Sequence, residues 1–293
     1  MMRNKTVMIT GAGSGLGRNL AFELVRRGYQ VFGTAASKAE IDDLAAATAG
    51  MARLTLCDIT LPTEVLNMAA AVSGATDGKL DLLVSNAGIL TPGPLETMTL
   101  TAVRREFEVN TFAVLTVINA FLPALREANG RVVQVSTMSV DFPSPFNGLS
   151  SASKAAAEAF MTVYKAELAA SGVEVLTAVC GNMRTGGPAK TAAAIEHVRS
   201  SFTPGQREVY EDMFDRFAMR MNTGQAHGLD ADLAAKQIAD LAERHPAPTR
   251  EPIGDDARTL MAYVRQTTAE EQFQRRLKSI ETRNEESRTK DKE

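Results

Sequence analysis

The segment from Thr10 to Gly17, with the sequence TGAGSGLG, constrains the fold of this chain more than any other feature. It follows a short apolar, β-branched run and precedes a helical stripe that begins near Leu16 and ends at Gly28. Glycine is needed where a backbone turns sharply and approaches a phosphate, and a helix N-terminus presents free amides to that phosphate. The order strand, glycine-rich loop, helix therefore predicts a phosphate-binding loop, whereas a glycine-rich stretch outside that context would predict only a tight turn.

Six short apolar runs alternate with longer segments of helical spacing over the first 180 residues. The runs are Thr6–Thr10, Gln30–Thr34, Ala52–Leu56, Leu80–Ser85, Arg131–Ser136 and Val173–Val179. Their residues do not alternate with polar ones, as expected of strands covered on both faces. Helices between successive strands imply parallel pairing. The sequence therefore predicts an α/β fold with a doubly wound parallel sheet, in a Rossmann-type three-layer αβα arrangement.

The composition of the chain changes after Gly181, where glycine, proline, threonine, methionine and charged residues are mixed. We expect residues 182–229 to form a lid over a ligand site, within a single domain that spans residues 1–279. Helices are expected at Arg207–Met221 and Asp230–Glu243, and a short strand near Glu251–Ile253. Asp255 is expected to cap a further helix. The polar residues 280–293 are expected to form a frayed or disordered tail.

Composition excludes several classes of protein. The 293 residues carry 32 Lys and Arg against 35 Asp and Glu, and a net charge of −3 argues against a nucleic-acid binder. Two cysteines and three scattered histidines match no disulfide framework and no metal-binding spacing. No run of 18 apolar residues and no apolar signal core are present. We therefore expect a cytoplasmic protein with no membrane attachment and no metal.

Further motifs follow the glycine-rich loop, whose spacing is GxxxGxG. They are Asp58-Ile59, Asn86-Ala87-Gly88, Asn110, Val135-Ser136-Thr137, Ser151-Ala152-Ser153-Lys154 and the segment from Gly181 to Thr185. In this order and at these separations, they make residues 5–265 resemble the short-chain dehydrogenase/reductase family. The resemblance implies an NAD(P)-dependent oxidoreductase that transfers hydride between nicotinamide and a carbonyl or secondary alcohol.

The resemblance also implies roles for individual residues. Asn110 would hold a water, Thr137 would orient the substrate, Ser150 would stand at the acid/base position and Lys154 would bind the nicotinamide ribose. The residues expected to bind the cofactor are Gly11, Ser14, Gly15, Leu16, Gly17, Ser37, Lys38, Asp58, Ile59, Asn86, Ala87, Gly88, Lys154, Gly181, Met183 and Thr185.

The sequence departs from the family pattern at the reacting groups. The family has a tyrosine four residues before the lysine, where this chain has Ser150, and a serine thirteen residues earlier, where it has Thr137. Threonine keeps a hydroxyl. Serine is shorter by a phenyl ring, and it is much less acidic than a phenol of pKa about 10 beside an ammonium. A positioned general acid contributes about 10²–10⁴-fold in rate, so this second change is severe.

Several hypotheses follow from Ser150. A water bound by Ser150 and Lys154 carries the proton, or Tyr210 of the lid supplies it. Alternatively, the protein is a nucleotide-binding pseudoenzyme that acts as a sensor or scaffold. Gly148-Leu149-Ser150-Ser151-Ala152 also resembles the serine elbow of hydrolases, but that motif needs a strand running into it. Prolines in the preceding residues 141–147 predict a loop there instead.

The choice of nucleotide depends on the end of the second predicted strand. No acid stands there to bind ribose hydroxyls, and Ala36 occupies the place of the arginine that is common in NADP-dependent relatives. Ser37 and Lys38 could hold a 2′-phosphate, so NADP is favoured over NAD; Ser37 could equally be a helix cap. From the resemblance we also expect a small, apolar carbonyl or alcohol substrate and a homodimer or homotetramer.

Overall fold

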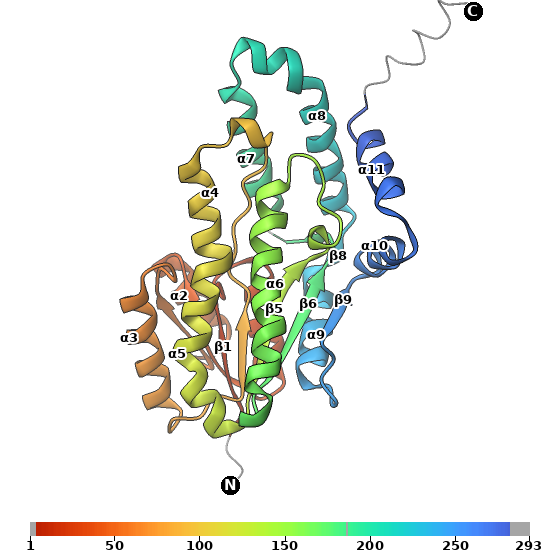
Figure 1. The fold of residues 1–293 in the computed structure, drawn as a ribbon. Helices are drawn as coiled ribbons and strands as arrows, with labels where there is room; N and C mark the ends of the chain where they lie inside the picture. The colour runs from red at the N-terminus through yellow and green to blue at the C-terminus, as the bar shows by residue number, and fades with distance from the viewer. Residues whose placement is uncertain (1–3, 186, 282–293) are drawn as a thin grey trace, which may run out of the picture.

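The computed structural model describes residues 4–185 and 187–281. Within these residues a seven-stranded sheet forms the centre of the protein, with strand order β3-β2-β1-β4-β5-β6-β9 and parallel pairing throughout (Figure 1). The strands are β1 Thr6–Ile9, β2 Gln30–Ala35, β3 Ala52–Leu56, β4 Leu82–Ser85, β5 Arg131–Thr137, β6 Glu174–Cys180 and β9 Arg250–Ile253. All six predicted apolar runs and the predicted edge strand are confirmed.

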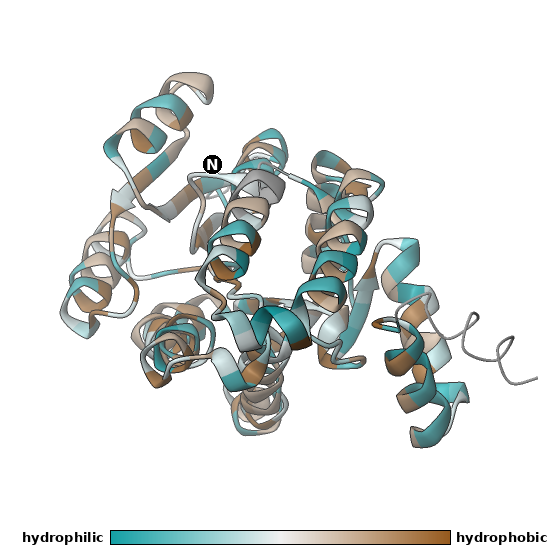
Figure 2. Cartoon of the chain, turned by 90° about the horizontal axis from the view of Figure 1, so that it is seen from above, coloured by the Kyte–Doolittle hydropathy of each residue, from teal (hydrophilic) through white to brown (hydrophobic). Residues whose placement is uncertain are grey.

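Helices cover both faces of the sheet, which confirms the three-layer Rossmann-type arrangement. One face carries α1 (Gly15–Arg26), α2 (Lys38–Ala47) and α9 (Ala231–Glu243). The other carries α3 (Pro62–Ala75), α5 (Ala113–Ala128) and α6 (Gly148–Leu168). Viewed from above, the helices carry hydrophilic and hydrophobic residues side by side along their length (Figure 2). Each of these six helices can therefore bury one stripe against the sheet and expose the other.

The residues predicted to form a lid, 182–229, contain two helices above the carboxyl ends of the strands, α7 (Gly187–Ser201) and α8 (Pro204–Ala226) (Figure 1). Two short parallel strands, β7 (Met183–Arg184) and β8 (Leu229–Asp230), join the two ends of this segment. The predicted helix at Arg207–Met221 lies inside the longer α8, which begins at a capping box between Thr203 and Gln206. No sequence pattern predicted α7.

The chain ends in α10 (Asp255–Gln266) and α11 (Ala269–Lys278). The expectation that Asp255 caps α10 is wrong: Gly254 is the cap, with φ +92°, and Asp255 is the first helical residue. Glycine adopts this φ without strain, so it can turn the chain from β9 directly into the helix. Most of the predicted polar tail, residues 282–293, lies outside the described residues.

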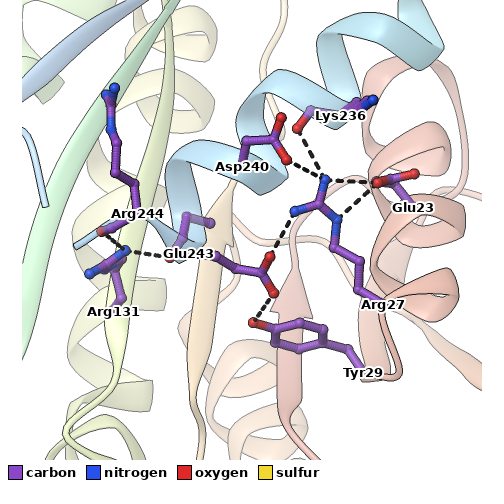
Figure 3. Close-up of polar contacts among 9 residues, drawn as sticks. Glu23, Arg27, Tyr29, Arg131, Lys236, Asp240, Glu243 and Arg244 are labelled. Carbon is purple, nitrogen blue, oxygen red and sulfur yellow. Dashed lines mark hydrogen bonds and ion pairs between the residues drawn. The ribbon is translucent and has the colours of Figure 1, made fainter.

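A polar network joins α1 to α9 on one face of the sheet, near the amino ends of the strands (Figure 3). The Arg27 guanidinium donates to Glu23 at 2.9 Å, to Asp240 at 2.6 Å and to Glu243 at 2.7 Å. Tyr29 donates its hydroxyl to the same Glu243 at 3.1 Å. One cation thus satisfies three carboxylates from two helices that are distant in sequence.

One helix passes a length-and-composition test for a membrane span. The continuous helix Leu100–Ala128 comprises α4 (Leu100–Phe107), a π-helical turn at Glu108–Phe112, and α5. Its most apolar window is 61% buried inside the protein, and Phe121 and Leu125 are fully buried against the sheet. The segment is accordingly a core helix of this fold.

Candidate active site

The glycine-rich loop lies between the end of β1 and the start of α1. Gly11 and Gly15 have φ of +66° and +55°, which L side chains rarely adopt. A Cβ at Gly17 would lie 2.9 Å from the carbonyl carbon of Gly11 and 2.7 Å from the Asn86 side-chain nitrogen. Ser14 is the N-cap of α1, and its side chain makes no capping bond. The loop therefore forms a close backbone cradle with free helix amides, which fits a nucleotide diphosphate.

Neighbouring strand ends hold this cradle in place. Thr34 accepts the Gly11 amide through its hydroxyl at 2.8 Å, and Thr10 accepts the amides of Asn86 and Ala87 at 2.9 and 3.0 Å. The Asn86 side chain donates to the carbonyl of Thr10 at 2.9 Å. Asn86 and Ala87 were expected to bind the cofactor, and the structure places them directly behind the loop. Leu16 is buried beneath it.

Asp58 and Ile59 follow β3 at the same edge of the sheet. The Asp58 carboxylate accepts the amide and the hydroxyl of Thr60 at 3.0 and 2.7 Å, and these bonds hold its pKa below the ordinary value. Ile59 is buried against the core beside α3. Asp58 thus keeps an ionised carboxylate just beyond the carboxyl end of β3.

The groups expected to hold a 2′-phosphate have other partners. The Ser37 hydroxyl accepts the amide of Glu40 at 3.3 Å, so Ser37 is the cap of α2, the alternative that the sequence left open. Lys38 pairs with Asp42 at 3.1 Å. Sequence reasoning missed Glu40, whose carboxylate reaches back to accept the Ala36 amide at 2.9 Å. An acid therefore does lie at the end of β2, although it comes from the following helix.

Asn110 and Lys154 lie together beside Gly88. A Cβ at Gly88 would lie 3.1 Å from both the Asn110 Oδ1 and the Lys154 Nζ atoms. Asn110, in the π-helical turn, accepts the Ile89 amide at 2.9 Å and donates to the Ile89 carbonyl at 3.0 Å and to Ser153 at 3.0 Å. Its amide is therefore fully engaged in holding the segment after Gly88. A π-helical turn commonly marks a functional site.

Thr137 and Ser150 lie in the wall of one cavity of about 730 Å³ under the lid. Thr137 ends β5, and its hydroxyl lies 2.9 Å from that of Ser139. Ser150 lies in the first turn of α6, one turn before Lys154. Gly181, Met183 and Thr185 line the same cavity. A Cβ at Gly15 would lie 3.9 Å from the Thr185 side chain, so the cavity adjoins the glycine-rich loop.

Among the described residues, no tyrosine lines this cavity. Tyr210, the alternative proton donor, instead packs edge-on against Phe146 at 6.2 Å in the aromatic cluster of the lid. Burial and the neighbouring Glu96 raise the pKa of its hydroxyl, which makes it a weaker acid. Tyr164 donates to Asn119. The hydroxyls that do line the cavity belong to serines and threonines.

The electrostatics around Lys154 are unusual. Its Nζ donates to the carbonyl of Val135 at 3.1 Å, and withdrawal from solvent lowers the pKa of its ammonium from the ordinary 10.5. The negative charges of Glu106 and Glu158 act in the opposite direction, more weakly than burial. Burial raises the pKa of the nearby Cys180 thiol to about 12, so that thiol stays protonated. Lys154 is therefore a stronger acid than an ordinary lysine.

Several cavity residues were missed by sequence reasoning. Asn147 is buried, its side-chain oxygen has no hydrogen-bond partner, and it lies one turn before Ser150. Arg220 enters the wall from α8 and Arg275 from α11, beside apolar side chains such as Phe142 and Leu260. No local signal marks these residues, because the wall forms from segments separated by more than a hundred positions. The cavity combines an apolar body with a few polar groups.

No metal site accompanies this cavity within the part of the chain that the structure describes: no cluster of three or more His, Cys, Asp or Glu side chains occurs there. The segment before Ser150 is a loop and not a strand, since β5 ends at Thr137 and α6 starts at Gly148. The geometry needed for a hydrolase serine elbow is therefore missing.

Comparison with known proteins agrees with this geometry. The family model for short chain dehydrogenases matches residues 5–195, and the chain belongs to this family of oxidoreductases. The chain is 27% identical over 262 residues to a 3-ketodihydrosphingosine reductase of Bacteroides thetaiotaomicron, covering 89% of this chain and 92% of that protein. It is 33% identical over 186 residues to an NADPH-dependent 1-acyldihydroxyacetone phosphate reductase of Schizosaccharomyces pombe, covering 63% of this chain and 62% of the relative.

Solved structures show the same architecture. A short-chain dehydrogenase from Streptomyces avermitilis superposes with a TM-score of 0.75 at 27% identity, covering 90% of this chain and 92% of the other. With two fungal short-chain dehydrogenases the sequence match spans only 64% and 62% of the relative's length. The family model ends at residue 195, so most of the lid and all of α8 to α11 lie beyond it.

Proposed function

We propose that this protein is an NAD(P)-dependent oxidoreductase that interconverts a carbonyl group and a secondary alcohol. The observation that carries the proposal is the junction between the glycine-rich cradle and the lid cavity, where Thr185 meets Gly15 and Thr137 and Ser150 line the wall. Family membership and an NADPH-dependent relative support this class of cofactor. When bound, the nicotinamide would supply or accept the hydride.

The residues that would hold the nucleotide follow from the cradle. Gly11, Gly15 and Gly17 leave room for the diphosphate at the start of α1, and Asp58 offers a carboxylate at the rim. Lys154 lies beside Gly88, where it would bind the nicotinamide ribose. These assignments rest on the family resemblance together with the positions of the side chains.

The proton for the substrate oxygen is the distinctive step. We assign the donor to Lys154, acting through a water held by the Ser150 hydroxyl, since a serine alone is too short and too weak an acid. The lowered pKa of Lys154 suits this role, because a proton donor works best when its pKa is near the working pH. Thr137 would hold the substrate oxygen by its hydroxyl. The ammonium would then regain its proton from solvent.

The walls of the cavity favour a substrate with an apolar body and a polar end. Met138, Phe142, Phe217, Met221 and Leu260 supply apolar surface. We further propose that the protein works in the cytoplasm and pairs with a second copy through α5 and α6. Phe112, which immediately precedes α5, and Phe160 and Val163 of α6 expose 49, 38 and 51% of their surface, which supports such pairing.

A second candidate function is a nucleotide-binding pseudoenzyme that acts as a sensor or scaffold. The lack of any tyrosine among the described residues of the cavity wall favours it. The two candidates share nucleotide binding and differ in hydride transfer. A Ser150→Tyr variant separates them, because the cavity has room for the larger side chain.

The experiment has two stages. Fluorescence titration with NADPH and NADH is expected to give low-micromolar binding of at least one of them. Ser150→Tyr is then expected to raise turnover of a panel of aliphatic and cyclic ketones by about 10²-fold, the lower range for a positioned general acid. Ser144→Tyr, in the same wall but in the loop before α6, serves as the matched control and should not raise this turnover. Absence of nucleotide binding up to millimolar concentration would refute both candidates.

A further inference from the structure

The carboxylate of Glu40 lies where the end of β2 meets the glycine-rich loop. Glu40 is the third residue of α2, and its own amide is held by the Ser37 cap. Its side chain turns back along the helix, and its Oε2 atom accepts the Ala36 amide at 2.9 Å. The first turn of α2 thus places a negative charge at the end of β2, which carries no acid of its own.

The same side chain lies against the loop itself. A Cβ added at Gly13 would lie 2.8 Å from the Glu40 carboxyl carbon and 2.9 Å from its Cβ. Because Gly13 has no side chain, the Glu40 side chain can occupy the space beside it. The carboxylate bridges the two segments between which the adenosine ribose of a dinucleotide sits in a Rossmann-type fold.

Positive charges near Glu40 are committed to other acids. Lys38 pairs with Asp42 at 3.1 Å, and Arg18 pairs with Asp43 at 2.6 Å. The bonds and ion pairs of the described residues give Glu40 no cationic partner. This corner of the site therefore carries more negative than positive charge, and the Ala36 amide at the end of β2 already donates to a carboxylate.

Resting on the proposed nucleotide binding, we propose that Glu40 makes this protein select NAD(H) over NADP(H). A carboxylate accepts hydrogen bonds from ribose hydroxyls. A 2′-phosphate in the same place would meet a like charge and would have to displace Glu40 from the Ala36 amide. This preference is the reverse of the one predicted from the sequence, which rested on the lack of an acid within β2 and on Ser37 and Lys38 as phosphate ligands.

The test is a fluorescence titration of the full chain with NADH and, separately, NADPH. For the unchanged protein we expect Kd for NADH to be at least about tenfold lower than Kd for NADPH, a difference of about 1.4 kcal/mol. In Glu40→Gln the amide can still accept from Ala36, but the charge is gone. NADPH binding is then expected to tighten about tenfold, while NADH binding changes by less than about threefold.

Glu271→Gln is the matched control. Glu271 is also the third residue of its helix and also accepts a backbone amide, that of Thr268 at 2.7 Å, but it lies in α11, outside the nucleotide corner. Its variant should leave the ratio of the two Kd values unchanged. A preference for NADPH in the unchanged protein, or an equal ratio before and after Glu40→Gln, would overturn this inference alone. Failure of both nucleotides to bind would overturn the proposed function with it.

Discussion

Lys154 is tied to the strand that presents Thr137. Its Nζ atom donates to the carbonyl of Val135 at 3.1 Å, two residues before β5 ends at Thr137. The cation of α6 and the hydroxyl at the strand end therefore share one rigid support. A displacement of β5 would move both groups together, so their spacing is insensitive to movement of the lid.

Replacing Lys154 should remove the proposed proton donor. We expect Lys154→Met to lower ketone reduction by about 10²–10⁴-fold, the contribution of a positioned general acid. In the unchanged protein, reduction should fall as pH rises through the lysine pKa, because only the ammonium donates. That fall should occur below the ordinary 10.5, since withdrawal from solvent lowers this pKa.

The matched control for this prediction is Lys165→Met. Lys165 stands on the same helix and contacts Thr249 on an exposed face of the protein. The pH profile of reduction would be measured for all three proteins. An unchanged alkaline limb in Lys154→Met would show that another group supplies the proton.

Glu106 should make stability depend on pH. It is fully buried, its Oε2 atom accepts the Thr91 amide at 2.9 Å, and burial raises the pKa of its carboxyl above the ordinary 4.5. Between the unfolded and folded pKa values the native state binds more protons than the unfolded state. The stabilising effect of this proton is thus complete below the unfolded pKa and is lost as pH rises through the folded pKa.

Urea unfolding at several pH values measures this effect. Glu106→Gln cannot titrate, so the free energy of unfolding of the unchanged protein should decline relative to the variant from about pH 4 upward. Glu108→Gln, two residues further along the chain at an exposed position, is the control. Parallel curves for the native protein and Glu106→Gln would contradict the prediction.

Arg27 should matter for stability and not for nucleotide binding. Arg27→Ala would leave the buried Glu23 and two further carboxylates without their shared donor. An unsatisfied buried polar group costs about 1–3 kcal/mol, so we expect a loss of that size in the free energy of unfolding. Arg26→Ala also removes an ion pair to Glu23, at 3.1 Å, but the Arg26 side chain is 78% exposed, so this loss should be less than about 0.5 kcal/mol. Denaturant unfolding of the two variants measures the loss of stability. Nucleotide titrations of the same variants show whether binding is unchanged.

The exposed apolar side chains of Phe112, Phe160 and Val163 give a prediction about assembly. Phe160→Asp places a charge in the proposed contact between two copies, so the variant should run as a monomer where the unchanged protein runs as a dimer or tetramer. Phe273→Asp changes an aromatic side chain of 49% exposure on α11 and should leave the assembly unchanged. Sedimentation velocity distinguishes the two outcomes. Identical sedimentation of the native protein and Phe160→Asp would refute the proposed interface.

The sequence predicted the sheet and the cradle because both depend on local chemistry. Apolar runs without alternation identify strands covered on both faces, and a glycine-rich segment between a strand and a helix identifies the loop, so Gly11 and Gly15 are found from a few neighbouring residues. The segments of helical spacing between these runs predicted connecting helices, and α5 around Phe121 is one of them. Each of these elements needs no knowledge of what lies across the fold.

The lid and the nucleotide corner required the structure. The helix α7 is rich in alanine and carries no apolar stripe, so packing against α8 decides its conformation and no pattern marks it. Glu40 was missed because its carboxylate reaches back four positions to the Ala36 amide, whereas the sequence pattern places the acid within the strand. Asn147 and Arg220 face one cavity only because distant segments fold together.

The paired strands β7 and β8 have a consequence for how this molecule can diverge. Met183 is aligned with Leu229 and Arg184 with Asp230, and the latter two also form an ion pair at 2.8 Å, so the two ends of the lid are fastened to each other. The helices α7 and α8 between them form a long insertion that leaves and re-enters the fold at one place. Doubling the length of such a loop costs only about 0.6 kcal/mol in chain entropy. Insertions and substitutions between β7 and β8 can therefore change which substrates fit the cavity. They leave the glycine-rich loop unchanged.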